Sequence, residues 1–245
     1  MAGAPRGELS GRPAPVLRGR LLHRLAWEAG RARLRAGAGR RAFTPPPSGP
    51  AAALHVTTVA RLPAEVVAAL APALDRLRAS GPGHHYYPPG TVHLTVQNLD
   101  GLDLDGDAGA ARLAELRALA GSHPPFQAAV RGLGVSASTV FAQVLPGDAT
   151  LRALRADLRR FLERHAPARP RPRSLGHANV VRFAGPVTAA FLAELARQRR
   201  RDFGGWTVTE VELVRTDRYL SHEGTTVLAR IGLGLRGPGP GSGPS

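Results

Sequence analysis

The sequence predicts an α+β fold in which mostly antiparallel strands have helices on their outside. Short β-branched runs with a period of two alternate with segments whose leucines recur every three or four residues. The elements follow a repeating order: a strand with His93, a helix, two strands, a helix, and a strand with His177. Strands separated both by helices and by short turns are typical of α+β domains.

The helices are predicted from apolar residues at helical spacing. In the first helix, Val66, Leu70, Leu74 and Leu77 mark one side, and the Gly81-Pro82-Gly83 turn ends it. The predicted helices cover residues 64–79, 108–120, 151–165 and 187–200. The predicted strands are the β-rich runs at residues 53–60, 91–99, 126–135, 139–144, 206–215 and 225–235.

Both ends of the chain differ in composition from its middle. Residues 1–50 are rich in arginine and end in a proline-rich run typical of a semi-rigid linker, while residues 16–41 have the pattern of a basic amphipathic helix. A targeting peptide, an RNA-binding arm and a start codon placed too far upstream remain open, and we expect disorder in this extension. The Gly/Pro-rich residues 237–245 are expected to be disordered too, which leaves 51–236 as the predicted domain.

The composition is typical of a globular protein without a membrane partner. The chain has 245 residues, 43% of them hydrophobic, so it can bury one substantial core or two small lobes. No run reaches the roughly 18 apolar residues of a membrane-spanning helix, and residues 1–10 lack the pattern of a secretory signal. The lack of cysteine excludes disulfides, thiolate nucleophiles and Cys-ligated zinc. We expect a cytoplasmic protein, with a monomer as the default.

The net charge of +15 is compatible with a nucleic-acid partner, because cations gain affinity for phosphates by releasing counterions. All 33 basic residues are arginine, however, alongside abundant Ala, Gly and Pro, which codon bias in a GC-rich genome explains equally well. Residues 1–50 carry a net charge of +8 and the rest of the chain +7, so the predicted domain is only moderately basic.

Two short strings, 84 residues apart, suggest the chemistry. His93-Leu94-Thr95 and His177-Ala178-Asn179 each place a histidine two positions from a small hydrogen-bonding side chain, on the same face of a strand. An acid/base site needs one group that takes a proton and another that gives one, and each string supplies one candidate. Imidazole suits both roles because its unperturbed pKa of about 6.5 lies near neutral pH.

With these strings in this order of elements, the chain resembles the 2H phosphoesterase superfamily, and within it the 2′-5′ RNA ligase-like (LigT-like) proteins. The similarity spans about residues 53–235. Besides the two H-x-T-like strings, it rests on Leu62-Pro63 before the first helix, the approach at residues 88–92, Pro125-Phe126, the Gly-Leu-Gly turn at 132–134, and the closing runs at 211–216 and 226–231.

The resemblance implies a bilobal fold with pseudo-twofold symmetry, in which two mostly antiparallel sheets face a central cleft. It also implies metal-independent hydrolysis, or ligation, at a 2′,3′-cyclic phosphate or 2′-5′ phosphodiester, with no cofactor. By position, His177 is the base that activates water and His93 the acid at the leaving oxygen, although the sequence does not fix which is which. Thr95 donates a hydrogen bond to a non-bridging phosphate oxygen.

Four residues near these motifs raise questions that the sequence leaves open. Asn179 stands where the family has Thr or Ser; its amide still donates to phosphate but is larger and differently aimed. Arg182 matches a position that is often basic, yet simple alternation places it on the face opposite His177, so contact with phosphate requires a bulge or the strand's end. Tyr87 either stacks on a base or packs beneath the cleft mouth. Gln97 either lines the cleft or is solvated, and we expect the second.

The leading interpretation is therefore a phosphodiesterase, with RNA 2′-5′ ligation as a second activity, acting on RNA ends or a small cyclic nucleotide. A catalytically impaired RNA- or nucleotide-binding protein is the alternative, because of Asn179, and a third interpretation makes the histidines structural. Two other motifs are set aside. The G-x-G-x-x-G match at 232–237 opens no helix, and the acidic run at 103–107 lacks the terminal acids of a calcium loop.

Overall fold

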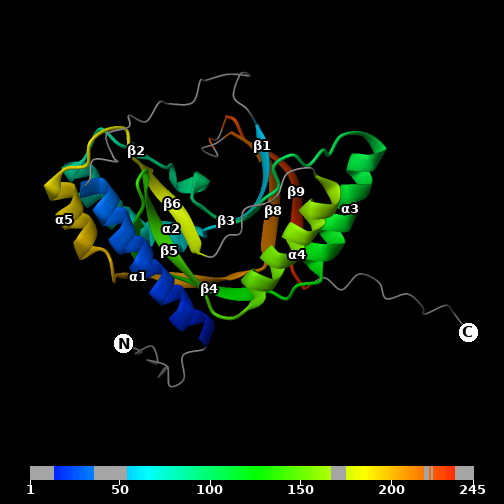
Figure 1. Cartoon of the computed structure of the whole chain (residues 1–245), viewed down its shortest axis with the longest axis horizontal. Helices are drawn as coiled ribbons and strands as arrows, with labels where there is room; N and C mark the ends of the chain where they lie inside the picture. The colour runs from blue at the N-terminus through cyan, green and yellow to red at the C-terminus, as the bar shows by residue number, and fades with distance from the viewer. Residues whose placement is uncertain (1–13, 36–53, 167–174, 218–220, 222, 235–245) are drawn as a thin grey trace, which may run out of the picture.

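The computed structural model describes residues 14–35, 54–166, 175–217, 221 and 223–234. Its strands form one antiparallel sheet, which confirms the α+β prediction (Figure 1). The strands are β1 (His55–Arg61), β2 (His85–Tyr86), β3 (His93–Asn98), β4 (Phe126–Val135), β5 (Thr139–Pro146), β6 (Gly176–Arg182), β7 (Asp202–Val208), β8 (Glu210–Thr216) and β9 (Thr226–Gly232).

Helices predicted from leucine spacing are present close to their expected ends. The helices are α1 (Ala14–Arg35), α2 (Ala64–Ser80), the short 3-10 helix η2 (Pro89–Thr91), α3 (Gly106–Gly121), α4 (Thr150–His165) and α5 (Ala189–Arg197). The periodic residues of α2 and α4, such as Leu70 and Leu158, are fully buried, which is why the 3.6-residue period was informative. Among the described helices, none combines the length and apolar character needed to cross a membrane.

The sheet consists of two halves, β7-β4-β5-β6 and β3-β1-β8-β9, with the short β2 paired to β6. They meet where β3 and β6 pair through Leu94 and Ala178, both fully buried. The two sheets expected to face a cleft are thus continuous across this single antiparallel junction. The arrangement gives the molecule its two-lobed form, with equivalent strands on either side of the Leu94–Ala178 pair.

One predicted strand was wrong. Residues 206–215 were expected to form a single closing strand, but the chain breaks at Thr209 into two strands on different halves. β7 pairs with β4 at the edge of one half, whereas β8 pairs with β1 in the other. An apolar run crossing from one half to the other looks continuous in sequence, since periodicity does not show which strand a residue pairs with.

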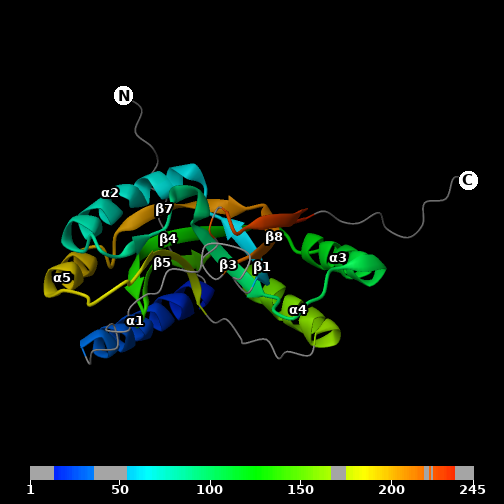
Figure 2. The ribbon, with the colours of Figure 1, turned by 90° about the horizontal axis from the view of Figure 1, so that it is seen from above.

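The helices divide between the two halves of the sheet. α2 and α5 pack against each other and against β7 and β4, while α3 and α4 pack against each other and against β9 and β3. Helix α1 packs on β4 and β5, and Figure 2 shows it on the side of these strands opposite α2. This helix therefore lies on a sheet face that the other helices leave open.

The expectation of disorder in residues 1–50 does not hold for α1, which forms the basic amphipathic helix that the sequence pattern also indicated. Trp27 and His23 are about as buried as core residues, at 1% and 2% exposure. A Cβ atom at Gly30 would collide with the carbonyl oxygen of Val135, so glycine allows the helix to approach β4 closely. Burying a tryptophan stabilises this docking by about 2–3 kcal/mol or more. The parts of residues 1–50 outside α1, and residues 237–245, lie outside the described residues.

Candidate active site

Both predicted motifs lie at the junction of the two halves. Because Leu94 pairs with Ala178 in antiparallel register, His93 lies across from Asn179 and Thr95 lies across from His177. The central residues of both motifs point into the core, so the four polar side chains share the opposite face of the sheet, called here the motif face. Diagonal positions on neighbouring antiparallel strands are about 7–8 Å apart. The sheet thus brings the two histidines together on adjacent strands of one face, instead of on opposing walls.

His93 has a fixed ring orientation. It is buried, with 5% exposure, and its Nδ1 lies 2.7 Å from the carbonyl oxygen of Thr91. A carbonyl oxygen only accepts hydrogen bonds, so Nδ1 carries the proton and donates. In the neutral ring the other nitrogen, Nε2, is therefore the proton acceptor. Thr91 ends the η2 turn just before β3, so the chain segment leading into the strand sets the tautomer.

His177 lines a cavity of about 430 Å³ on the motif face. Asn179, Arg182 and Phe141 share this cavity, and the rings of Phe141 and His177 are in edge-on contact with centroids 5.4 Å apart. Phe141 lies on β5 directly across from Asn179. Gly176 starts the strand without a side chain, because a Cβ there would collide with the Val144 carbonyl oxygen. The second motif thus opens into a space large enough for a small ligand.

A β-bulge brings Arg182 to the motif face. β5 pairs Val140 with Val181 and Phe141 with Asn179, so Val180 is an extra residue on β6. Val180 and Val181 are both fully buried, and Arg182 returns to the side of His177, where it lines the same cavity. The bulge that the sequence required for Arg182 is therefore present.

The first motif has the same irregularity. β1 pairs Thr58 with Gln97 but Val59 with Thr95, which makes Val96 the extra residue on β3. Gln97 is consequently buried, at 1% exposure, and the expectation that it is solvated was wrong. Asn98, five residues after His93, occupies the position that Arg182 has after His177, and it accepts a hydrogen bond from Thr57 Oγ1 at 3.1 Å.

Tyr87 does not offer a ring face to a base. Its side chain belongs to the buried core, with 5% exposure, and Arg182 Nε donates a hydrogen bond to its hydroxyl at 3.3 Å. The neighbouring His84 packs edge-on against Phe183 and Phe191. Of the two alternatives in the sequence, packing beneath the cleft fits this geometry, and Tyr87 orients Arg182 in the cavity.

Arg155 of α4 was missed by the sequence analysis. It is buried, and its guanidinium donates to the carbonyl oxygens of Val96 at 2.8 Å, Thr95 at 2.9 Å and Leu175 at 3.2 Å. It therefore ties the bulge of β3 to the residue just before β6. Only its place among the leucines of an amphipathic helix, where Arg155 follows Leu154, hinted that this arginine is buried.

Helix α1 forms one wall of the His177 cavity, a role that the sequence did not predict. The residues it contributes are small, Ala26, Ala29 and Gly30, followed by Arg33 one turn later. Small side chains leave the space beside His177 open, and Arg33 adds a second guanidinium to that of Arg182. Within the described part of the chain, no three His, Asp or Glu side chains converge into a set that could hold a metal ion.

Comparison with known proteins identifies the family. The family model described as the 2′-5′ RNA ligase superfamily matches residues 66–220, more than half of the chain. Among solved structures, TT0787 of Thermus thermophilus is 26% identical, with a TM-score of 0.57 over 75% of this chain and 98% of its own. E. coli LigT, crystallised with NADP+ and with 3′-AMP, is 18–19% identical, with a TM-score of 0.52 over 74% of this chain and 98% of its own, a likeness of fold. A search of curated proteins finds no match. With its duplicated motif strands, its nine-stranded sheet and this family match, the chain belongs to the 2′-5′ RNA ligase superfamily and has the 2H phosphoesterase fold.

Proposed function

We propose that the protein is a phosphodiesterase that opens a 2′,3′-cyclic phosphate or cleaves a 2′-5′ phosphodiester, at RNA ends or in small nucleotides, without needing a metal. RNA 2′-5′ ligation is the same displacement with another nucleophile: the 5′-hydroxyl of a second RNA attacks the cyclic phosphate in place of water, and the ribose 3′ oxygen leaves. The observation that carries this proposal is the pairing of Leu94 with Ala178, which sets His93 and His177 diagonally on one sheet face. Their spacing of roughly 7–8 Å leaves room for a phosphate between two imidazoles.

The reaction requires two proton transfers on opposite sides of phosphorus. His177, neutral, takes a proton from water as the water oxygen attacks phosphorus. His93, protonated, gives its Nε2 proton to the ribose oxygen as the phosphorus–oxygen bond breaks. The Thr91 carbonyl accepts from Nδ1 throughout and stabilises the charged ring. The product is a ribose hydroxyl beside a phosphate monoester. General acid–base catalysis of this kind typically accelerates a reaction by about 10²–10⁴-fold.

Charge on the phosphate oxygens is stabilised by donors on the motif face. The Thr95 hydroxyl and the Asn179 amide lie across from His177 and His93 respectively, so one donor stands beside each imidazole. Arg182 and Arg33 line the cavity next to His177 and provide positive charge for a phosphate. A preorganised donor of this kind lowers the barrier by about 3 kcal/mol. The LigT complexes with NADP+ and 3′-AMP support a nucleotide as the ligand class.

Asn179 favours one alternative, a protein that binds RNA ends or nucleotides but turns them over poorly. The amide is wider than a hydroxyl and donates from a different position, so it can hold phosphate without matching the transition state. In this case the cavity, Arg182 and Arg33 would keep their binding role.

The test measures hydrolysis of a nucleoside 2′,3′-cyclic phosphate, and of an RNA ending in one, in the presence of EDTA. The parent protein is compared with His93→Ala, His177→Ala and the matched control His165→Ala, whose ring pairs with Glu115 on the α3–α4 side of the molecule. We expect turnover in the parent and the control, and a loss of at least about 10²-fold in each site variant. Binding without turnover in the parent would establish the alternative, and neither binding nor turnover would refute both.

A further inference from the structure

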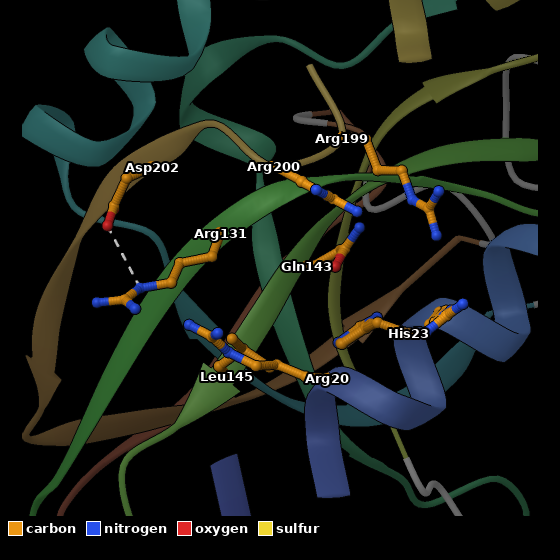
Figure 3. A pocket seen from close by; sticks show the side chains of 9 residues that line it. Arg20, His23, Arg131, Gln143, Leu145, Arg199, Arg200 and Asp202 are labelled. Atoms are coloured by element: carbon orange, nitrogen blue, oxygen red, sulfur yellow. Dashed lines mark ion pairs between the residues drawn. The ribbon is translucent and has the colours of Figure 1, made fainter. Parts of the chain in front are cut away.

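A second cavity, of about 330 Å³, lies on the other flank of α1 (Figure 3). Helical spacing separates the two flanks: Ala26, Ala29 and Arg33 face the His177 cavity, while Arg20 and Arg24 face the second one. The second cavity is therefore separate from the proposed catalytic site, with the body of α1 between them.

Arginines from three segments surround this cavity. Figure 3 shows Arg20 of α1, Arg131 of β4, and Arg199 and Arg200 of the connection between α5 and β7 around one space. Arg24 of α1 completes the set. Segments far apart in the sequence thus contribute five arginines to the lining of one cavity.

Among the described residues, few acidic side chains lie beside these arginines. Asp202 lines the cavity and lies 3.3 Å from Arg131 Nε, and Glu28 lies 3.5 Å from Arg199 but is mostly exposed. Even without Arg20, the other four arginines and both acids together carry a formal charge of +2. Like charges gathered in a small volume repel one another, and a bound anion would relieve that repulsion.

Other polar side chains of the lining already have partners in the protein. The ring of His23 faces the backbone of Val144 and Gly176, and Arg131 Nε lies 3.3 Å from Asp202. Gln143 lines the same cavity and donates through Nε2 to the Leu133 carbonyl oxygen at 3.0 Å. The feature that indicates a ligand is therefore the concentration of arginines.

We propose that this cavity is a second anion site, which binds a compact ligand with two or three linked phosphates and thereby holds α1 on the sheet. The volume is at the low end for small-molecule sites of about 300–1,000 Å³, which favours an oligophosphate group over a whole RNA segment. Guanidinium groups suit phosphate because they bind its oxygens with two parallel hydrogen bonds. The ligand joins Arg20 and Arg24 of the helix to Arg131, Arg199 and Arg200 of the body.

The experiment titrates the full-length protein with inorganic triphosphate by calorimetry, against sodium chloride of matched ionic strength. The test variant is Arg24→Ala/Arg200→Ala, which changes two exposed cavity arginines. Arg117→Ala, an exposed arginine of α3, is the matched control, and Arg24→Lys/Arg200→Lys keeps the charge. We expect saturable binding to the parent and the control, weakened at least about ten-fold in the double alanine variant and less in the lysine variant. Hydrogen exchange of residues 14–35 should slow on addition of triphosphate in the parent and the control, but not in the double alanine variant.

Each other result overturns the proposal. No saturable binding beyond the effect of salt removes the site, and equal binding by the double alanine variant places it elsewhere. If triphosphate binds but does not slow hydrogen exchange of residues 14–35, the ligand does not hold α1 on the sheet. A short RNA that binds more tightly than triphosphate through the same arginines would replace an oligophosphate with a polynucleotide as the ligand. These readouts do not depend on catalysis, so they stand apart from the test of the proposed function.

Discussion

The two motif strands have the same backbone arrangement but differ in the exposure and contacts of their polar side chains. In both, a histidine, a polar residue two positions on and another polar residue five positions on lie on one face, because each strand has a bulge between the second and third of these residues. Around His93 the set is closed: the ring is buried, and Asn98 is hydrogen-bonded to Thr57. Around His177 it is open: the ring is partly exposed and lines a cavity with Arg182.

This difference shows that backbone symmetry and chemical symmetry are separate properties. The duplicated strand and bulge determine where the groups lie, and the residue types decide which side carries positive charge. Arg182 and Arg33 both belong to the His177 side, so we expect the bulk of an anionic substrate to lie there. We therefore expect His93, with its fixed tautomer, to act on the leaving oxygen.

The largest expected effect concerns the residue that ties the two halves together. Arg155→Met should lower the free energy of unfolding by about 3–4 kcal/mol, because three buried carbonyl oxygens lose a charged donor. Urea denaturation measures this loss, and Arg152→Met, an exposed arginine one turn earlier on α4, should change stability by less than about 0.5 kcal/mol. Similar values for the two variants would mean that Arg155 does not join the halves.

The second prediction compares the donors beside the two histidines. Thr95→Ala should lower kcat/KM for a 2′,3′-cyclic nucleotide about 10²-fold, since it removes a donor to the phosphate. Asn179→Thr, which restores the family residue, should keep or raise the activity, and Asn179→Ala should lower it. Steady-state kinetics on the three variants measure this. If Asn179→Ala were as active as the parent, Thr95 alone of these two residues would supply a donor.

Helix α1 gives the His177 side a pH dependence. Burial lowers the pKa of His23 to about 4, so the ring is neutral in the docked helix, whereas an undocked ring titrates at its usual value. Protons therefore bind better to the undocked state, and docking should be constant above about pH 6.5 and weaken as the pH falls toward 4. The loss by pH 4 is about 3 kcal/mol, at 1.36 kcal/mol for each pKa unit.

Fluorescence of Trp27 follows this docking in a Trp206→Phe background, because the chain has two tryptophans. His23→Leu keeps an apolar contact beneath the helix and should remove the dependence between pH 6.5 and 4. If the variant and the parent show the same pH profile, carboxylates elsewhere control docking and His23 does not.

The smallest expected effect compares Arg182 with Asn98, which are equivalent by position. Arg182→Ala should raise KM about ten-fold through the loss of one charged contact to phosphate. Asn98→Ala should leave KM within about two-fold, because Asn98 bonds to Thr57 and we assign it no substrate contact. Equal effects at the two positions would show that substrate phosphate is held on both sides of the junction.

Sequence patterns predicted the strands of His93 and His177 well, since a period of two needs only local information. They gave the wrong environment for Gln97 and left open which face of the sheet Arg182 occupies. One extra residue on a strand moves every later side chain to the opposite face. Arg155 and Arg33 were missed for another reason. Their roles depend on which strand or cavity their helices meet, and that is a tertiary contact without a local signal. The boundary at residue 50 stays a prediction, although the docking of Trp27 means that truncation there removes part of the core.

The account rests on two imidazoles acting on one phosphorus atom, and the pH dependence of kcat/KM tests this most directly. For a nucleoside 2′,3′-cyclic phosphate, the parent should give a bell-shaped profile, because one histidine must be neutral while the other is protonated. His93→Ala and His177→Ala should each be slower by at least about 10²-fold, and each should lose a different limb of the bell. A variant that keeps both limbs, or that retains activity within a few-fold of the parent, would contradict the paired role of His93 and His177.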